Sequence, residues 1–456
     1  MPALHAARWP ALLLAGALLP LSSPALDLRE SFQAAMTQDS DLLAARSAAE
    51  AGREILPMAR GQLLPGLSVS YSRFDNDLNT RSTNFAGDTN SFDSRYPSEN
   101  ALLTLRQPLY RPNVLAAYQQ AKSHLQSVEA TLGKAVQDLA LRVSEAYFNV
   151  ILAEEGLRVA MAQQAAIAAQ FDSARRALAA GQGTRTDIDE AQSRLDLNRA
   201  QELGARQQID EAQHRLESLI NQPVTRVSPL DRAVLQLEAP AATSLHLWIA
   251  RAEATNPEQL DLKAQVETYR LGAVRARAGH KPSIDLIAQR SLNKSDNITN
   301  PDATYLNSQI GVQVSLSLYS GGAVNSQIRQ AVANQHEAEQ QQEAARRRLE
   351  TEVRRQFNAV TVGVLKIRAL EQAERSTDEA IKSNEKSFAA GVRSRLDILN
   401  AQGQRSQVLL ELAQERVNYV LSHLRLLALT GGLNLAEIST VNGWLAGSDI
   451  AGQGPQ

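Results

Sequence analysis

The sequence predicts a mixed α/β membrane protein made of two similar halves, in which amphipathic β-strands lead into very long antiparallel helical hairpins. Three observations lead to this fold class. A long segment of the chain recurs, each half holds a long stretch without proline, and each half contains two segments in which apolar and polar residues alternate. The uninterrupted stretches, 113–181 and 322–391, are long enough for helical rods of about 100 Å.

The composition is that of an ordered protein with few aromatic side chains. Of 456 residues, 43% are hydrophobic, 21% charged and only 4% aromatic, and the formal net charge is −2. Compact cores use aromatic residues heavily, whereas long helices packed side by side can manage with Ala, Leu and Val. The small net charge does not indicate a nucleic-acid partner. The absence of cysteine excludes disulfides, cysteine-based metal sites, thiol catalysis and a lipidated cysteine.

The N-terminus has the pattern of a signal peptide over residues 1–25. Arg8 supplies a positive charge, residues 11–19 form an apolar stretch, and Ser23-Pro24-Ala25 offers small residues for cleavage. The alternative is a buried core helix. No later segment approaches the roughly 18 consecutive apolar residues of a transmembrane helix. The pattern therefore predicts an exported protein without a helical membrane anchor.

The internal repeat is clearest around two glycine turns. Residues 179–188 and 389–398 share Ala-Ala-Gly, then Thr or Ser followed by Arg, then Asp-Ile. Such a duplication predicts two structural units of the same element order. We therefore expect a first repeat over 26–220, a linker over 221–242, a second repeat over 243–430, and a C-terminal segment and tail over 431–456.

Within each repeat the expected order is a helix, two strands, a long helix, a turn and a return helix. Apolar residues spaced by three and four, such as Leu139, Val143 and Tyr147, indicate helices with a coiled-coil-like seam. The motifs Thr184-x-x-Asp187 and Ser394-x-x-Asp397 are capping boxes that begin the return helices. The expected long helices are 112–180 and 323–390, and the expected return helices are 186–220 and 396–429.

Four segments alternate between apolar and polar residues with the period of a strand. We expect strands at about 66–74, 101–110, 283–291 and 309–319, joined within each half by polar loops over 76–100 and 293–307. Strands of this length, apolar on one face, are typical of membrane barrels. Half-buried hairpins of a soluble domain are the alternative. Four strands cannot close a membrane barrel, so two, three or four copies would have to share one.

Several motifs, in this order, resemble the TolC family of outer-membrane efflux and type I secretion channels. They are Leu64-Pro65-Gly66-Leu67, Ala146-Tyr147-Phe148-Asn149-Val150, the two glycine turns, and the stretch 318–331 that begins Leu318-Tyr319-Ser320-Gly321-Gly322. The resemblance implies a homotrimer in the outer membrane of a Gram-negative bacterium, with a shared 12-strand β-barrel continued by a periplasmic α-helical barrel. It also implies a periplasmic adaptor protein and an inner-membrane ABC or proton-driven transporter as partners, and outer-membrane lipid as surroundings.

The resemblance places a periplasmic gate at the hairpin tips. Asp397 falls on the family's inner aspartate ring, whereas the family's second acid falls here on Asn400, which puts a full double ring in doubt. Links between hairpins are expected from Asp187 and Thr186 on the first hairpin and from Phe388 and Arg393 on the second. Arg393 is expected to pair with Asp187, or else to be a solvated turn residue. Phe388 replaces a tyrosine, so a hydroxyl is lost and a leakier gate is expected.

The same tips also have plain structural interpretations. Asp187 and Asp397 are the acids of capping boxes, and Gly181 and Gly391 supply left-handed residues at helix ends. By resemblance these two glycines, with Gly183, belong to the surface on which adaptors dock.

No catalytic constellation is expected. The seven histidines are scattered without metal-ligand spacing, and no glycine-rich loop indicates a phosphate site, so we predict neither an enzyme nor a cofactor or metal. A soluble periplasmic coiled-coil adaptor is the main alternative, and it leaves the duplicated strands unexplained. A lipoprotein-type efflux subunit is a second alternative, and it lacks its cysteine. The exported substrate, protein or drug, stays open.

Overall fold

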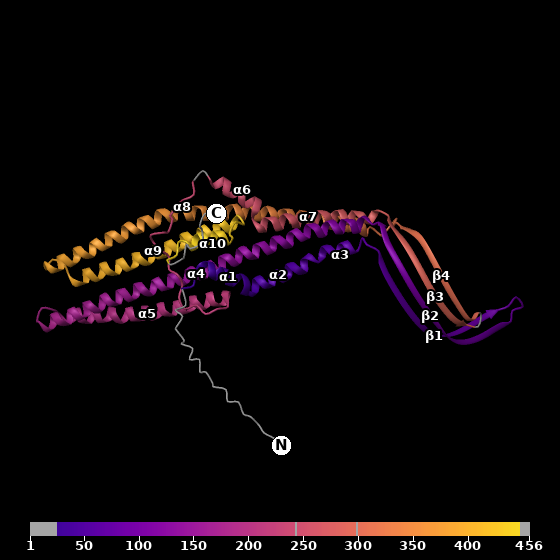
Figure 1. Cartoon of the computed structure of the whole chain (residues 1–456), viewed down its shortest axis with the longest axis horizontal. Helices are drawn as coiled ribbons and strands as arrows, with labels where there is room; N and C mark the ends of the chain where they lie inside the picture. Colours follow the sequence, from indigo (N-terminus) through magenta and orange to yellow (C-terminus); the bar gives the residue numbers. More distant parts are fainter. Residues whose placement is uncertain (1–24, 242–243, 298–299, 447–456) are drawn as a thin grey trace, which may run out of the picture.

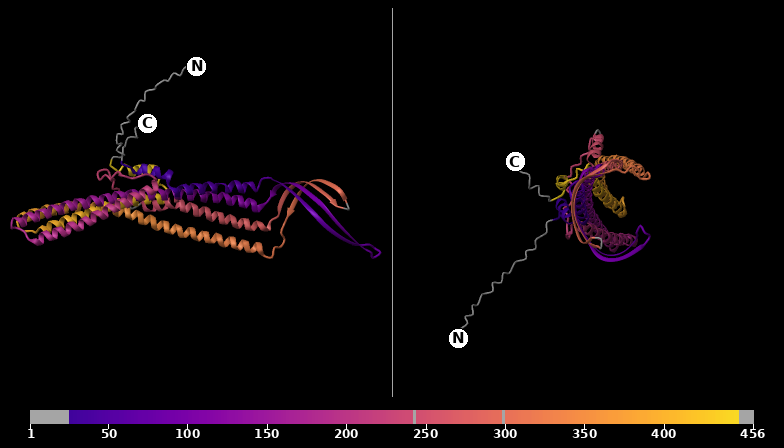
Figure 2. Two further views of the ribbon diagram at one scale, coloured as in Figure 1. Left: turned by 90° about the horizontal axis from the view of Figure 1, so that it is seen from below. Right: turned by 90° about the vertical axis from the view of Figure 1, so that its right-hand side faces the viewer.

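The computed structural model describes residues 25–241, 244–297 and 300–446. The predicted signal peptide, apart from Ala25, and the last ten residues of the tail lie outside this range. The molecule is elongated: the long helices run side by side from two hairpin tips at one end to a sheet at the other (Figure 1). The sheet bends away from the helices and forms, with them, an open curved wall (Figure 2).

Four long helices make two antiparallel hairpins. The first consists of α4 (Pro112–Ala179) and α5 (Arg185–Ile220), and the second of α8 (Ala323–Ala389) and α9 (Arg395–Leu429). Each of these helices begins and ends within one residue of its predicted range. At 1.5 Å per residue α4 and α8 are each about 100 Å long.

The single helix expected at the start of each repeat is interrupted in the structure, so that prediction was wrong in detail. The first repeat begins with α1 (Leu28–Gln38), α2 (Ser40–Arg53) and α3 (Ile55–Gly61). The second begins with α6 (Leu245–Thr255), α7 (Pro257–Arg277) and the 3₁₀ turn η2 (Ala278–His280). The breaks before α2 and α7 are at Asp39 and Asn256, whose side chains accept the backbone N–H of Leu42 and Gln259 and so cap the next helix. The break before α3, at Glu54, has no side-chain cap.

The four strands form one antiparallel sheet in the order β1-β2-β3-β4, and most of them are longer than predicted. They are β1 (Gly66–Thr83), β2 (Thr89–Tyr110), β3 (Ser283–Asn297) and β4 (Asn300–Ser315). Most of the supposed polar loop 76–100 is paired strand, because a ladder outside a membrane tolerates polar residues on both faces. The fourth strand ends at Ser315 rather than 319, before the turn that holds Gly321 and Gly322 at positive φ.

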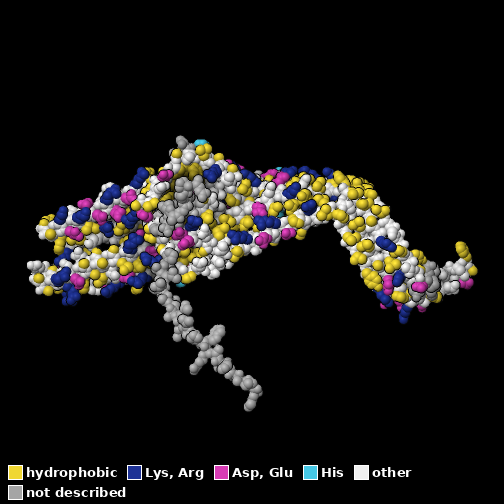
Figure 3. Space-filling view, in the orientation of Figure 1, with side chains coloured by type: hydrophobic (Ala, Val, Ile, Leu, Met, Phe, Trp, Pro, Cys, Tyr) yellow, Lys and Arg dark blue, Asp and Glu magenta, His cyan; other side chains and the backbone are white. Residues whose placement is uncertain are grey.

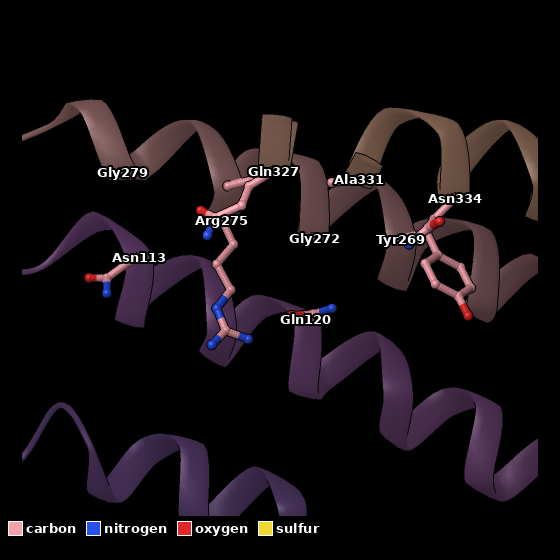
Figure 4. A pocket seen from close by; sticks show the side chains of 10 residues that line it. Asn113, Gln120, Tyr269, Gly272, Arg275, Gly279, Gln327, Ala331 and Asn334 are labelled. Atoms are coloured by element: carbon pink, nitrogen blue, oxygen red, sulfur yellow. The ribbon is translucent and has the colours of Figure 1, made fainter. Parts of the chain in front are cut away.

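One face of the sheet near the helices is apolar. The register places Leu67, Leu105, Ala288 and Ile310 in one row across the four strands, with further apolar rows on either side. Arg290 interrupts this face, next to Leu103. The opposite face carries mainly Ser, Thr, Asn and Gln. Figure 3 shows the hydrophobic side chains gathered over the part of the strands nearest the helices.

The largest buried cluster lies at the waist of the molecule, where α1, α4, α5, α8 and α9 meet the linker and the C-terminal helix α10 (Leu435–Asn442). Tyr147 is fully buried there, and its hydroxyl lies 3.0 Å from the carbonyl oxygens of Leu26 and Ser228 and accepts the Ser228 N–H. Tyr419 bonds the linker in the same way at Gln236 and Glu238. Two tyrosines thus hold the linker against the helices.

A buried carboxylate joins the sheet to the long helix. Asp285, on β3, is almost fully buried, and both of its oxygens accept hydrogen bonds from Arg106 on β2 and Arg111 before α4. Two guanidinium groups compensate the single buried charge, which would otherwise be costly. The cluster fixes how strand β2 passes into α4.

None of the described helices combines the length and the apolar character needed to cross a membrane.

Candidate functional site at the hairpin tips

The two hairpin tips lie beside each other at the end of the molecule farthest from the sheet (Figures 1 and 2). Ile167 of α4, Leu195 of α5 and Leu399 of α9 form a small buried apolar cluster between the hairpins. Both terminal guanidinium nitrogens of Arg194, on α5, donate hydrogen bonds of 3.4 Å to the side-chain oxygen of Asn400. The tips are therefore in contact within one chain.

Each tip turns at a glycine in the left-handed region. Gly181 and Gly391 have φ of 74° and 77°, and the N–H of the following residue, Gln182 or Val392, reaches back to a carbonyl of the preceding helix at 2.9 Å. This is the Schellman type of helix end, which favours glycine. A Cβ on either glycine would have no neighbour within 4 Å, whereas a Cβ on Gly183 would lie 3.0 Å from the backbone nitrogen of Leu178.

Both capping boxes are present. Asp187 accepts the backbone N–H of Thr184 at 3.0 Å, and Thr184 accepts that of Asp187 at 3.2 Å. In the second hairpin the same pair of bonds joins Ser394 and Asp397, at 2.9 and 3.3 Å. These hydrogen bonds from Thr184 and Ser394 lower the pKa of the two carboxyl groups, which therefore stay ionised at neutral pH. Asp187 and Asp397 therefore each carry a negative charge at the tips.

The expected pairing of Arg393 with Asp187 is not what the structure shows within one chain. The Arg393 guanidinium lies 3.5 Å from Asp397 of its own hairpin. The arginine whose charge lowers the pKa of Asp187 is Arg395. The charge of the second hairpin that acts on Asp187 is therefore that of Arg395, on the first turn of α9, and it acts at longer range than an ion pair.

Arg395 also stacks on Phe388. Its guanidinium carbon lies 5.2 Å from the centre of the ring, within the range of a cation–π contact. Its Nη1 is buried, and no described residue accepts a hydrogen bond from it. Phe388 thus has a contact in the second hairpin that needs no hydroxyl. Thr186, the remaining residue expected at the gate, lies exposed on the first turn of α5.

Sequence reasoning missed Arg395 and Arg194 as members of the site. Arg395 lies within the repeated motif and matches Arg185 of the first half, so it looked like part of the helix start rather than a contact. Arg194 bridges Glu190 of its own helix, at 3.2 Å, and Asn400. Asn400 therefore supplies an acceptor for this arginine from the other hairpin. Across the described part of the chain no cluster of His, Cys, Asp or Glu could hold a metal ion.

Comparison with known sequences gives matches over nearly the whole chain. Residues 32–222 and 248–432 match the family described as outer membrane efflux protein. The chain is 30% identical to the proteases secretion protein PrtF of Dickeya chrysanthemi over 432 residues, which cover 94% of this chain and 93% of PrtF. It is also 30% identical to the alkaline protease secretion protein AprF of Pseudomonas aeruginosa, with 94% and 89% covered.

Solved structures have the same fold. The outer membrane protein VceC of Vibrio cholerae superposes with a TM-score of 0.76 at 17% identity, covering 89% of this chain and 97% of VceC. The open state of the MtrE outer membrane channel of Neisseria gonorrhoeae superposes with a TM-score of 0.70 at 20% identity, with 90% of each chain covered.

Proposed function

Because the chain belongs to the outer membrane efflux protein family, we propose that it forms, as a homotrimer, an outer-membrane exit duct for type I protein secretion. The observation that supports this most directly is the pairing of a four-stranded amphipathic sheet with two helical hairpins in a chain that matches two protease secretion proteins end to end. The relatives are secretion and channel proteins, not enzymes.

The open sheet supports a shared barrel. Strands β1 and β4 have no partner on their outer edges within the described chain. An unpaired edge cannot face lipid, because its N–H and C=O groups would have no water to bond. Closure therefore requires further copies, and three of them give twelve strands. In this barrel the apolar face points to lipid and the opposite, polar face lines the pore; we call them the lipid-side and pore-side faces.

The hairpin tips are proposed to be the gate at the periplasmic end. The hydrogen bonds of Arg194 to Asn400 and the apolar contact of Leu399 hold the second hairpin against the first, and the charge of Arg395 adds a longer-range attraction to Asp187. Docking of a periplasmic adaptor and an inner-membrane transporter at the glycine turns would release these weak contacts. The ionised Asp397 carboxylates, repeated by three-fold symmetry, would favour cations in the opening.

Conductance in planar bilayers tests the channel. Purified protein should insert without a partner and give discrete steps, with a reversal potential in a salt gradient that indicates cation selectivity. Folded protein that never inserts would contradict the channel, and release by detergent-free extraction would favour the soluble adaptor instead.

The substrate class is tested in a host that lacks its own exit duct. With a matching adaptor and transporter supplied, the chain should restore secretion of a protease to the medium. Drug efflux is the second candidate, supported by the family's description as efflux proteins. Recovery of drug resistance without protease secretion would favour efflux.

A further inference from the structure

The β1–β2 hairpin projects beyond the rest of the sheet (Figures 1 and 2). Its strands stay paired up to Thr83 and Thr89, whereas β2 last pairs with β3 at Ser98. From Asp75 to Thr83, past the last row that pairs with β3, the ribbon is about 30 Å long at 3.3 Å per residue. A two-stranded ribbon alone in water is only marginally stable. This segment therefore calls for packing that one chain does not supply.

The polarity of the ribbon reverses just past the last apolar row of the membrane segment, at Tyr71. On the lipid-side face the next rows carry ion pairs, Arg73 with Glu99 at 3.2 Å and Asp77 with Arg95 at 2.9 Å. Charges in these rows indicate that the lipid-side face has left the hydrocarbon. In Figure 3 charged side chains likewise appear where the hydrophobic part of the strands ends.

On the pore-side face the same rows become apolar. Phe74, Leu78, Phe92 and Tyr96 form a continuous patch, since Tyr96 lies opposite Asn76, between Phe74 and Leu78, and Phe92 lies opposite Thr80. Phe74, Leu78 and Phe92 are 62%, 44% and 43% exposed. The ladder has no bulge between the serines of the pore lining and this patch, so both lie on one face. Three aromatic residues here are a concentration in a chain with only 4% aromatics.

Two occupants of this patch can be set aside. Lipid is one of them, because the charged rows on the lipid-side face indicate that the ribbon has already left the hydrocarbon. An exported chain would occupy the pore only in passing, leaving the patch in water at rest, although large exposed apolar patches normally have a partner. The remaining occupant is the same patch on the other copies, which three-fold symmetry brings around one axis.

We propose that the β1–β2 ribbons of the three copies lean over the outer mouth of the barrel and pack their patches of Phe74, Leu78, Phe92 and Tyr96 together, closing the mouth with an apolar constriction. This rests on the shared barrel of the proposed function. The turn at the tip is built to hold its shape: the Asn84 side-chain oxygen accepts the N–H groups of Ala86 and Asp88 at 3.0 and 2.9 Å.

Cross-linking between copies tests the contact directly. The chain has no cysteine, so Leu78→Cys introduces a single thiol on the patch, and Asp77→Cys introduces one on the opposite face of the same strand. On intact cells, an oxidant or a short bis-maleimide should join Leu78→Cys chains at least ten times more than Asp77→Cys chains. Equal cross-linking, or none at Leu78→Cys in protein that still forms trimers, would overturn the constriction. Absence of trimers from the unmodified chain would instead refute the shared barrel.

Access to the pore tests the closure. Ser70→Cys, on the pore-side face below the patch, should react slowly with a bulky membrane-impermeant maleimide added outside the cell. Adding Phe74→Ser and Leu78→Ser should raise that rate about tenfold or more, whereas adding Arg73→Ser and Asp77→Ser on the other face should not. Equal rates in trimeric protein would show that the mouth is open at rest. If the serine variant does not assemble, the cross-linking of Leu78→Cys decides alone.

Discussion

Replacing Arg395 by alanine should open the periplasmic end of the resting channel. In the structure this side chain stacks on the Phe388 ring of its own hairpin at 5.2 Å, and its charge acts at longer range on Asp187 of the first hairpin. If the tips are the gate, both interactions belong to the closed state. Their loss should therefore shift the population toward open channels.

The size of the shift follows from ordinary magnitudes. A partly exposed cation–π contact contributes about 0.5–1 kcal/mol, and the longer-range attraction to the exposed Asp187 adds no more than about 0.2 kcal/mol, the low end for a surface ion pair. The buried Nη1 without an acceptor offsets part of this gain, which leaves about 0.5 kcal/mol per chain. Three chains that open together then lose about 1.5 kcal/mol. At about 1.4 kcal/mol per factor of ten, the open-to-closed ratio should rise about tenfold.

The assay is the open probability of single channels in planar bilayers without an adaptor. Arg185→Ala is the matched control, because Arg185 occupies the same place in the first hairpin, where Leu178 stands in the position of Phe388 and no ring can be stacked. Arg185 is highly exposed, and its guanidinium lies 3.7 Å from Asp189. If folded trimers of Arg395→Ala and Arg185→Ala had the same open probability, our assignment of Arg395 to the gate would be refuted.

Four further predictions concern charge, turn, waist and pH. Asp397→Asn should lower cation selectivity in the reversal potential, because the carboxylate ring is lost; unchanged selectivity would place the filter elsewhere. Gly391→Ala should cost about 1–2 kcal/mol in backbone strain at φ 77° and should impair export at equal trimer levels. Normal export by this variant would leave the turn a structural role only, and Gly181→Ala is the matching change in the first hairpin. Tyr147→Phe should lower the free energy of unfolding by about 1–3 kcal/mol, because buried backbone groups lose a partner; denaturant titration measures it. Burial lowers the pKa of His423 in the folded chain, so below about pH 6.5 the unfolded chain binds a proton at this histidine more readily than the folded chain does. The melting temperature should therefore fall as the pH falls below about 6.5, and it should fall less in His423→Gln.

The long helices were predictable because their end signals are local. A glycine followed within three residues by a capping box marks where one helix stops and the next begins, and both copies of the motif agree. The breaks at Asp39 and Asn256 also carry capping side chains, and Asn256 precedes a proline. The sequence therefore carries local signals for these two breaks, although the prediction was a single helix.

The outer halves of the strands were harder to predict. Beyond Tyr71 the phase of Leu67 and Val69 holds charges, and the residues that follow are rich in Asn, Asp, Ser and Thr, a composition that indicates a loop. The apolar residues continue in the opposite phase, at Phe74 and Leu78, so a single alternation does not run through the whole strand. The influence of Arg395 on Asp187 is not predictable for another reason: it depends on how two hairpins, far apart in the sequence, pack together.

The duplication explains why the two tips have the same turn, whereas residues that diverged afterwards give the tips different contacts. The residues that form the turn recur in both halves: the glycine at 181 and 391, and the capping acid at Asp187 and Asp397. Several residues around the turns differ between the halves. Phe388 stands where the first half has Leu178, Arg393 where it has Gly183, and Asn400 where it has Glu190. Phe388 and Arg393 contact Arg395 and Asp397 of their own hairpin, whereas Asn400 accepts hydrogen bonds from Arg194 of the other hairpin. One diverged position therefore joins the hairpins, while the other two give the second tip internal contacts that the first tip lacks.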